Sequence, residues 1–264
     1  MDALIKDYHN DLNPKAFSNC NDQTPGSNSC LDCFKRQYFD GNEIGYGCVE
    51  KRKLYLLRYF PVHRAENCQG AFRISDDVID DWMGHGHIDI LSVGGGPGSD
   101  ICGVLEYLEE EAEKREVELS VNVVRIDIEN QWDDVFEDVM KRFFPWANYQ
   151  TIHRDVNKGL DSISDEHFDL IMVSYLASEL STKQCMNLAN EIDSALADGG
   201  VLMINDRPED VVEEVIRSMF QSIKLSYEEY FLNGWAGYSY PNDIANAVGP
   251  KFRMNSRIFV GVKE

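Results

Sequence analysis

A group of glycines follows an apolar run, and this arrangement suits the binding of a nucleotide-like ligand. The run covers residues 88–93 and is rich in β-branched side chains. The glycines after it are Gly94, Gly95, Gly96 and Gly98. Apolar residues then recur at helical spacing over residues 101–108, which predicts a strand, a tight turn and a helix that begins near Ser99. Glycines let the backbone approach a ligand closely, and the free N–H groups of the helix point to the same place.

An acidic residue at the end of the next predicted strand strengthens this hypothesis. Residues 119–127 read as a strand that ends in Asp127. In a parallel sheet this carboxylate lies at the same edge as the glycine turn, where it can accept two hydrogen bonds from a ribose diol. Glu129 is the alternative ribose ligand, two residues further on.

The order of these motifs resembles that of the class I S-adenosylmethionine-dependent methyltransferases. The resemblance extends over about residues 86–264. It rests on the glycine turn and on residues 125–129, 155–156, 168–174 and 199–204. It implies an α/β fold with a Rossmann-like, seven-stranded, mostly parallel sheet and helices on both faces. The family usually has an acid two residues before the first glycine, which helps to organise the methionine end of the cofactor, and this chain has Ser92 there.

The resemblance also implies which residues bind S-adenosyl-L-methionine. They are Gly94, Gly95, Gly96, Gly98, Asp127, Ile128, Asp155, Val156 and Ser174. Among them, Asp155 is expected near the adenine amino group. We add Arg58, because a guanidinium and the carboxylate of the methionine moiety match as a two-pronged pair.

The first 85 residues fall outside the resemblance and are predicted to form an N-terminal addition of loops and helices, separate from a cofactor-binding domain at residues 86–264. Residues 48–65 predict a helix that Pro61 ends, and residues 71–83 predict a second helix capped by Ser75. The aromatic residues of the first helix suit core packing. A lid over the cofactor is the alternative, because this stretch holds the densest set of Tyr, Arg and His side chains.

Four cysteines in the addition have spacings that a zinc site could use. They are Cys20, Cys30, Cys33 and Cys48. One Cys-x-x-Cys pair supplies half of a tetrahedral site, but the second such pair is absent. Unrelated reduced thiols, and no metal, are therefore the main expectation.

Charge and hydropathy restrict the partners. The 264 residues carry a formal charge of −21, and such a surface repels nucleic acid. No apolar stretch has the length of a membrane span, and the first residues lack the apolar centre of a signal peptide. We expect a soluble protein in the cytoplasm, with a nuclear location left open.

The later part of the chain predicts further elements of the same fold. Residues 185–196 predict a helix that Gly199 and Gly200 end. A strand at residues 201–204 follows, and the aromatic stretch 233–242 reads as a loop. Residues 128–132 are expected to begin the second helix of the sheet domain.

The function that we expect is methyl transfer from S-adenosylmethionine to a small-molecule or protein acceptor. A base is needed only if the acceptor must lose a proton. Candidates by location are Tyr59, His63, Tyr175, Glu179 and Asp206. The alternatives are a nicotinamide dehydrogenase, a ribosomal RNA methyltransferase, which residues 174–180 resemble, and a binding module that has lost catalysis.

Overall fold

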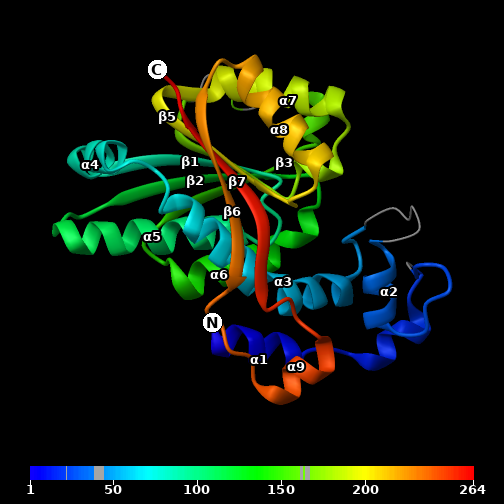
Figure 1. Cartoon of the computed structure of the whole chain (residues 1–264). Coiled ribbons are helices and arrows are strands. Elements are labelled where there is room, and N and C mark those ends of the chain that lie inside the picture. The colour runs from blue at the N-terminus through cyan, green and yellow to red at the C-terminus, as the bar shows by residue number, and fades with distance from the viewer. Residues whose placement is uncertain (22, 39–44, 161–162, 164–166) are drawn as a thin grey trace.

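A single seven-stranded sheet forms the centre of the protein (Figure 1). The computed structural model describes residues 1–21, 23–38, 45–160, 163 and 167–264. The strands are β1 (His87–Val93), β2 (Ser120–Asp127), β3 (Asn148–His153), β4 (Phe168–Ser174), β5 (Leu196–Asp206), β6 (Ser226–Trp235) and β7 (Arg253–Val262). Their order is β3-β2-β1-β4-β5-β7-β6. Strand β7 runs antiparallel to β5 and β6 and the other neighbours pair in parallel, which confirms the predicted Rossmann-like sheet.

Helices cover both faces of this sheet. Figure 1 shows α7 and α8 on one face, and α3, α5 and α6 on the other. The helices are α1 (Asp2–Asn10), α2 (Cys30–Arg36), α3 (Val49–Ala71), α4 (Asp76–His85), α5 (Ser99–Arg115), α6 (Asp133–Phe143), α7 (Thr182–Ala195), α8 (Asp210–Ser222) and α9 (Asn242–Val248). Short 3-10 turns are η1 (Pro14–Asn19), η2 (Asn130–Trp132), η3 (Val156–Lys158) and η5 (Ala177–Glu179).

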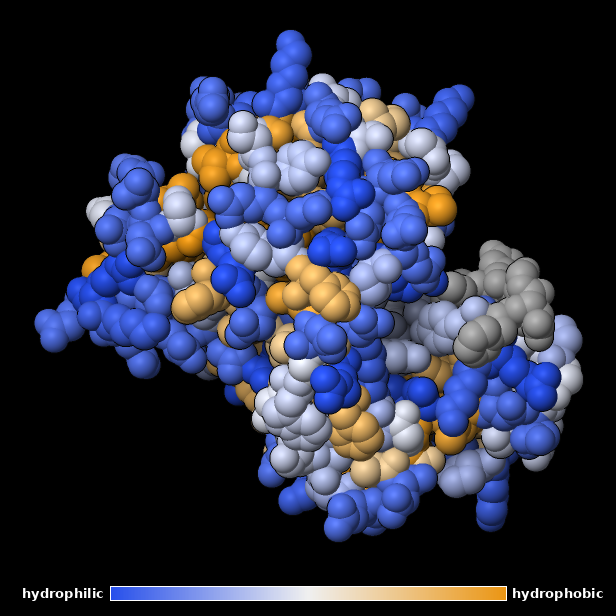
Figure 2. Space-filling view, viewed as in Figure 1, coloured by the Kyte–Doolittle hydropathy of each residue, from blue (hydrophilic) through white to orange (hydrophobic). Residues whose placement is uncertain are grey.

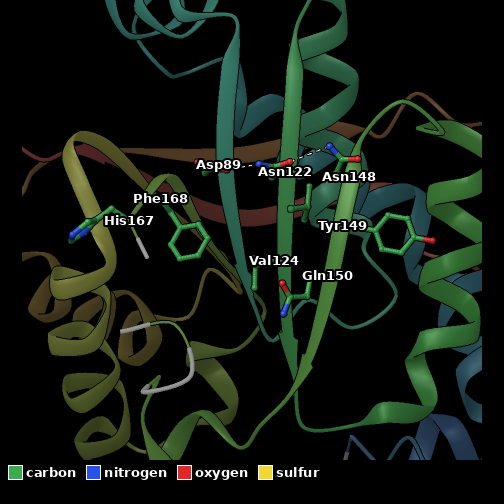
Figure 3. A pocket seen from close by; sticks show the side chains of 9 residues that line it. Asp89, Asn122, Val124, Asn148, Tyr149, Gln150, His167 and Phe168 are labelled. Atoms are coloured by element: carbon green, nitrogen blue, oxygen red, sulfur yellow. Dashed lines mark hydrogen bonds between the residues drawn. The ribbon is translucent and has the colours of Figure 1, made fainter. Parts of the chain in front are cut away.

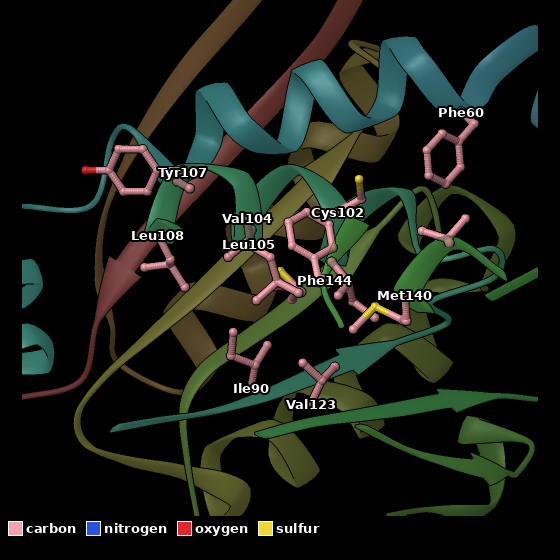
Figure 4. Close-up of a cluster of buried hydrophobic side chains, with 14 of the residues drawn as sticks. Phe60, Ile90, Cys102, Val104, Leu105, Tyr107, Leu108, Val123, Met140 and Phe144 are labelled. Carbon is pink, nitrogen blue, oxygen red and sulfur yellow. The ribbon is translucent and has the colours of Figure 1, made fainter. Parts of the chain in front are cut away.

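Two hydrophobic clusters fill the space between the sheet and its helices, because side chains of a strand alternate between its faces. On β1, Ile90 belongs to the cluster under α3 and α5, whereas Leu91 belongs to the cluster under α7 and α8. Figure 4 shows the first cluster, in which Phe60 of α3 and Leu105 of α5 lie above Ile90 and Val123. Helix α3, from the N-terminal addition, therefore shares its core with the sheet.

The prediction that Pro61 ends its helix is wrong, because α3 continues through this proline to Ala71. A proline inside a helix has no N–H for the carbonyl four residues earlier, which here is that of Leu57. The Tyr240 hydroxyl donates to the Leu57 oxygen at 2.8 Å. The Lys251 backbone N–H donates to the carbonyl of Arg58 at 2.9 Å. The chain between β6 and β7 thus supplies donors along the interrupted turn of α3.

Two other helix boundaries differ from those predicted. Helix α4 begins at Asp76, since α3 occupies the chain up to Ala71, but Ser75 caps it as expected by accepting from the Val78 N–H. The second sheet-domain helix, α6, begins at Asp133, and the short turn η2 precedes it.

Two strands are longer than predicted. Gly199 and Gly200 lie inside β5 and do not end a helix; their backbones pair with Lys263, through bonds of 2.9 Å in both directions. Strand β6 extends to Trp235, where it pairs with Arg253, so part of the predicted aromatic loop is strand. Pairing with Lys263 just after β7 explains the extension of β5, and pairing with Arg253 at the start of β7 explains that of β6.

Hydrophilic side chains dominate the face shown in Figure 2, and the hydrophobic ones form small, separate groups. Within the described ranges, none of the helices combines the length and apolar composition that crossing a bilayer requires.

Candidate active site

The glycine turn joins β1 to α5 at the carboxyl edge of the sheet, where open α/β sheets bind ligands. The N–H groups of Gly94 and Gly95 donate to the Ile126 carbonyl at 2.8 and 3.2 Å, which ties the turn to β2. Gly96 has φ +48° and Gly98 has φ +82°. A Cβ on Gly98 would lie 2.6 Å from the Phe136 ring, whereas one on Gly96 would meet nothing within 4 Å. Gly98 is therefore needed for packing, and Gly96 faces open space.

Asp127 ends β2 beside this turn, as predicted. Its Oδ2 accepts from the Gly96 N–H at 2.7 Å, and its Oδ1 accepts from the Glu129 N–H at 2.8 Å. Burial raises the pKa of Asp127, and these N–H groups together with the nearby Arg125 charge oppose that rise. Each carboxylate oxygen can accept a further bond, so the group remains able to bind a diol. Glu129 itself caps η2 by accepting from the Gln131 N–H.

A narrow pocket lies next to the glycine turn. Its walls are Gly94, Gly95, Gly96, Pro97, Ser99, Asp100, Ser174 and Tyr175, together with Tyr55 and His63 of α3. Its free volume is about 20 Å³, which is room for about one water molecule. A nucleotide-sized ligand would therefore extend beyond this enclosed space, over the open side of Gly96.

Three rings form a stack along this wall. The His63 ring lies 4.0 Å from the Tyr175 ring and 5.5 Å from the Tyr59 ring, measured between centroids. The Tyr55 hydroxyl lies 3.2 Å from His63 Nδ1. Burial, and then the charge of Lys251, lowers the pKa of His63 well below its usual value. The imidazole is thus neutral at neutral pH.

Tyr175 is held in an unusual position at the end of β4. Its φ is +57°, in the left-handed region that non-glycine residues seldom adopt. Its hydroxyl donates to Oε2 of the fully buried Glu66 at 2.7 Å, and Lys251 Nζ lies 3.2 Å from both Glu66 Oε1 and the Tyr175 oxygen. The Asn255 N–H also donates to Glu66 Oε1. Burial, and then the Glu66 charge, raises the pKa of Tyr175 well above its usual value, so this phenol is a fixed donor and not a base.

The other two carboxylates proposed as bases differ in their surroundings. Asp206 is buried, and both its oxygens accept from backbone N–H groups, those of Ser178 and Arg207. It therefore holds a loop in place. Glu179 keeps exposed surface, but the partial burial of its carboxyl and then the Asp206 charge raise its pKa to about 7.

The remaining predicted cofactor ligands lie in different places. The Arg58 guanidinium donates to the Val248 carbonyl at 2.6 Å, and Arg58 does not line the pocket, so we leave it out of the site. Ile128 is 70% exposed just after β2. Asp155 caps η3, which starts at Val156, by accepting from the Asn157 N–H.

The described residues of the proposed zinc set do not form a metal site. The Cys33 sulfur accepts from the Thr24 N–H at 3.1 Å, and the side chains of Cys20 and Cys48 hydrogen-bond to each other. All seven cysteines lie in the described ranges and are free thiols. Within those ranges no three His, Cys, Asp or Glu side chains are arranged to hold a metal ion.

A larger cavity, of about 530 Å³, lies elsewhere on the sheet (Figure 3). A row of polar side chains crosses it: Asn122 donates to Asp89 at 2.9 Å, and Asn148 donates to Asn122 at 3.1 Å. These residues belong to the amino-terminal halves of β1, β2 and β3. Since the glycine turn and Asp127 lie at the carboxyl ends, this cavity is separate from the candidate site.

Sequence reasoning missed Glu66, Lys251 and Asn255, which fix Tyr175 from two distant parts of the chain. A glutamate within a helix gives no sign that it is buried. Asp100 was missed as well, although its place after the glycine turn could have indicated it.

No protein-family model and no curated protein sequence matches the chain. Solved structures do resemble it. A putative O-methyltransferase from Nostoc punctiforme has 13% identity and a TM-score of 0.54, over 98% of this chain and 69% of that one. The pyocyanin biosynthetic protein PhzM has 14% identity and a TM-score of 0.52, over 83% of this chain and 60% of that one.

A precorrin-6y C5,15-methyltransferase from Geobacter metallireducens has 15% identity and a TM-score of 0.50, over 76% of this chain and 86% of that one. At these identities the likeness concerns the fold. The chain has the Rossmann-like fold found in class I methyltransferases.

Proposed function

We propose that the protein is an enzyme of the cytoplasm that transfers a methyl group from S-adenosyl-L-methionine to a nucleophilic atom, most simply that of a small molecule. The observation that carries this proposal is the Asp127 carboxylate at the end of β2, bonded to the Gly96 N–H where that glycine faces open space. A diol acceptor and a backbone free of side chains thus lie together at the ligand-binding edge of the sheet.

The residues around the turn fit the parts of this cofactor. Asp127 is suited to the ribose hydroxyls, and the exposed Ile128 to covering the adenine. Asp155 and Val156 follow β3 at the same edge, where a carboxylate can accept from the adenine amino group. When bound, the cofactor supplies an electrophilic methyl group, and the protein has to align the acceptor with it and exclude water.

The aromatic wall from α3 is suited to the acceptor side. His63 lines the pocket as a neutral imidazole, which can accept a hydrogen bond from the acceptor, but its lowered pKa makes it a weak base that suits only an acceptor that loses its proton readily. Tyr175, fixed by Glu66, can orient that acceptor through its ring. The charge of −21 disfavours RNA. The names of two structural neighbours, which refer to precorrin-6y and pyocyanin, support a small-molecule acceptor.

Thermal unfolding with added ligands tests the cofactor. We expect S-adenosylhomocysteine to raise the melting temperature and NAD to leave it unchanged, because a ligand stabilises the state that binds it. Stabilisation by NAD alone would contradict the proposal. Methyl transfer from labelled S-adenosylmethionine into small-molecule fractions of a lysate then tests catalysis, and binding without transfer would favour a module that has lost its activity.

A matched pair of glycine variants tests where the ligand binds. Gly96→Val should abolish binding, because the valine side chain would occupy the space proposed for the ligand at the turn. It should not unfold the protein, because a Cβ on Gly96 would meet nothing within 4 Å. Gly199→Val is the control, because Gly199 also has a positive φ and open surroundings but lies in β5 near the opposite edge. Equal binding by both variants would show that the turn only packs.

A further inference from the structure

The side chain of Asp100 is an incompletely satisfied carboxylate in the wall of the candidate site. Asp100 is the second residue of α5 and is 2% exposed. Its Oδ2 accepts from the Ser92 hydroxyl at 2.6 Å. Its Oδ1 is buried and makes no hydrogen bond of good geometry with the described residues. Burial raises the pKa of Asp100, and the Ser92 hydroxyl, the nearby N–H groups of Ile101 and Asp100 and the Arg125 charge oppose that rise. A buried carboxylate oxygen without a well-placed donor is costly, so this oxygen is available to a donor that a ligand brings.

The free oxygen belongs to the ligand pocket. Asp100 lines that pocket together with the glycine turn, His63 and Tyr175. Arg125 is the cation whose charge acts on Asp100. Its Nη1 is bonded to Asp133, its buried Nε and Nη2 make no hydrogen bond with the described residues, and Arg125 does not line the pocket. A bound ligand can therefore reach Asp100 from the pocket side, where no protein cation meets it.

Two carboxylates thus flank the glycine turn. Asp127 lies on the β2 side and is bonded to the Gly96 N–H, and Asp100 lies on the α5 side and is bonded to Ser92. A ligand that lies across the turn would meet a diol acceptor at one end and a partner for a cationic N–H group at the other. The sulfonium of S-adenosylmethionine has no N–H, whereas its α-ammonium has three.

We propose that Asp100, oriented by the Ser92 hydroxyl, binds the α-ammonium group of the methionine moiety and so fixes the direction in which the cofactor lies across the turn. This inference rests on the proposed function. It gives Ser92 a role as a positioning residue. It also gives the chain an acid for the amino-acid end of the cofactor. This acid lies on α5, whereas the family's usual acid would stand at the position of Ser92 in β1.

Three ligands and two variants test this inference by calorimetric titration. S-Adenosylhomocysteine has the complete amino-acid tail, its deamino analogue lacks only the ammonium, and 5′-methylthioadenosine lacks the whole tail. The parent should bind S-adenosylhomocysteine at least about 10-fold more tightly than the deamino analogue. In the analogue complex the ligand carboxylate lies near the Asp100 carboxylate, and the ammonium that would bind Asp100 is missing.

Asp100→Asn should weaken binding of S-adenosylhomocysteine about 10- to 100-fold and leave methylthioadenosine within about 3-fold. It should also bind the deamino analogue at least as tightly as the parent does. Ser92→Ala should show the same pattern with smaller changes, because it removes only the group that orients Asp100. Glu113→Gln, on the exposed side of the same helix, is the control variant.

Several results would overturn the inference and leave the proposed function intact. One is a parent that binds S-adenosylhomocysteine and the deamino analogue equally, a measurement that needs no variant. Another is Asp100→Asn weakening methylthioadenosine as much as S-adenosylhomocysteine. A parent that binds none of the three ligands would instead contradict the proposed function.

Discussion

Replacing Asp127 should reduce both cofactor binding and stability, since its carboxylate has two kinds of partner. It already accepts from the N–H groups of Gly96 and Glu129. In the proposed complex it also accepts from the two ribose hydroxyls. Asp127→Ala removes all four bonds, whereas Asp127→Asn keeps one acceptor oxygen and turns an NH₂ group towards a backbone donor.

The expected losses of affinity and of stability follow from the hydrogen bonds that each Asp127 variant removes. Charge-assisted hydrogen bonds contribute about 1.5–3 kcal/mol each before the cost of ordering. Asp127→Ala should therefore weaken S-adenosylhomocysteine binding roughly 10- to 1,000-fold. In Asp127→Asn one buried N–H loses its acceptor, at a cost of about 1–3 kcal/mol. For a chain of this size that lowers the melting temperature by roughly 2–12 °C, with a smaller loss of affinity than in the alanine variant.

Calorimetric titration with S-adenosylhomocysteine and thermal unfolding without ligand measure the two effects separately. Glu137→Gln, which removes a surface partner of Lys141, is the control for loss of an acidic charge. If both Asp127 variants bound like the parent and Glu129→Ala did not, the reasoning would be refuted and Glu129 would be the ribose ligand.

Three further variants test other parts of the structure. Gly98→Ala should lower stability by about 1–3 kcal/mol in denaturant unfolding, because its Cβ would lie 2.6 Å from Phe136; an unchanged midpoint would show that Phe136 moves aside freely. Tyr240→Phe should cost about 0.5–1.5 kcal/mol by removing the donor to Leu57, and no change would mean that another group replaces it. Since the folded-state pKa of Glu179 is raised to about 7 from 4.5, the parent loses stability relative to Glu179→Gln as pH rises from 4.5 to 7. A stability difference that stays constant over this range would contradict the raised pKa.

The glycine turn and the strands beside it could be predicted because their signals are local, whereas the seven-stranded sheet was expected from the resemblance to class I methyltransferases. The apolar run before Gly94, the spacing of apolar residues in α5 and the acid at the end of β2 each lie within about ten residues. The parallel pairing of β1 with β2 then brings Asp127 to the turn. Such features depend on periodicity and on strand direction, which the sequence displays directly.

The course of α3 could not be predicted, because it depends on partners far along the chain. Pro61 is a reliable sign of a helix end only when no distant group bonds the carbonyl it leaves free, and here Tyr240 does so. Likewise, nothing near Glu66 indicates that Tyr175, Lys251 and Asn255 surround it. The expected partnership of Arg58 with the cofactor rested on the two-pronged match between a guanidinium and a carboxylate, and the sequence gives no sign that the Val248 carbonyl accepts from that guanidinium.

The proline in α3 divides the helix into two parts that are anchored by different neighbours. The part of the helix after Pro61 is wedged against its neighbours, since a Cβ on Gly70 would lie 2.1 Å from Ile258, and α5 approaches at Gly103, where a Cβ would lie 2.2 Å from the Arg64 carbonyl. The part before Pro61 is linked to the β6–β7 chain through the carbonyls of Leu57 and Arg58. This earlier part also contributes Leu54, Leu57 and Phe60 to the hydrophobic core, and it carries Tyr55, which lines the pocket. A change at Tyr240 would therefore act on the segment that forms one wall of the site, without touching the ligand itself.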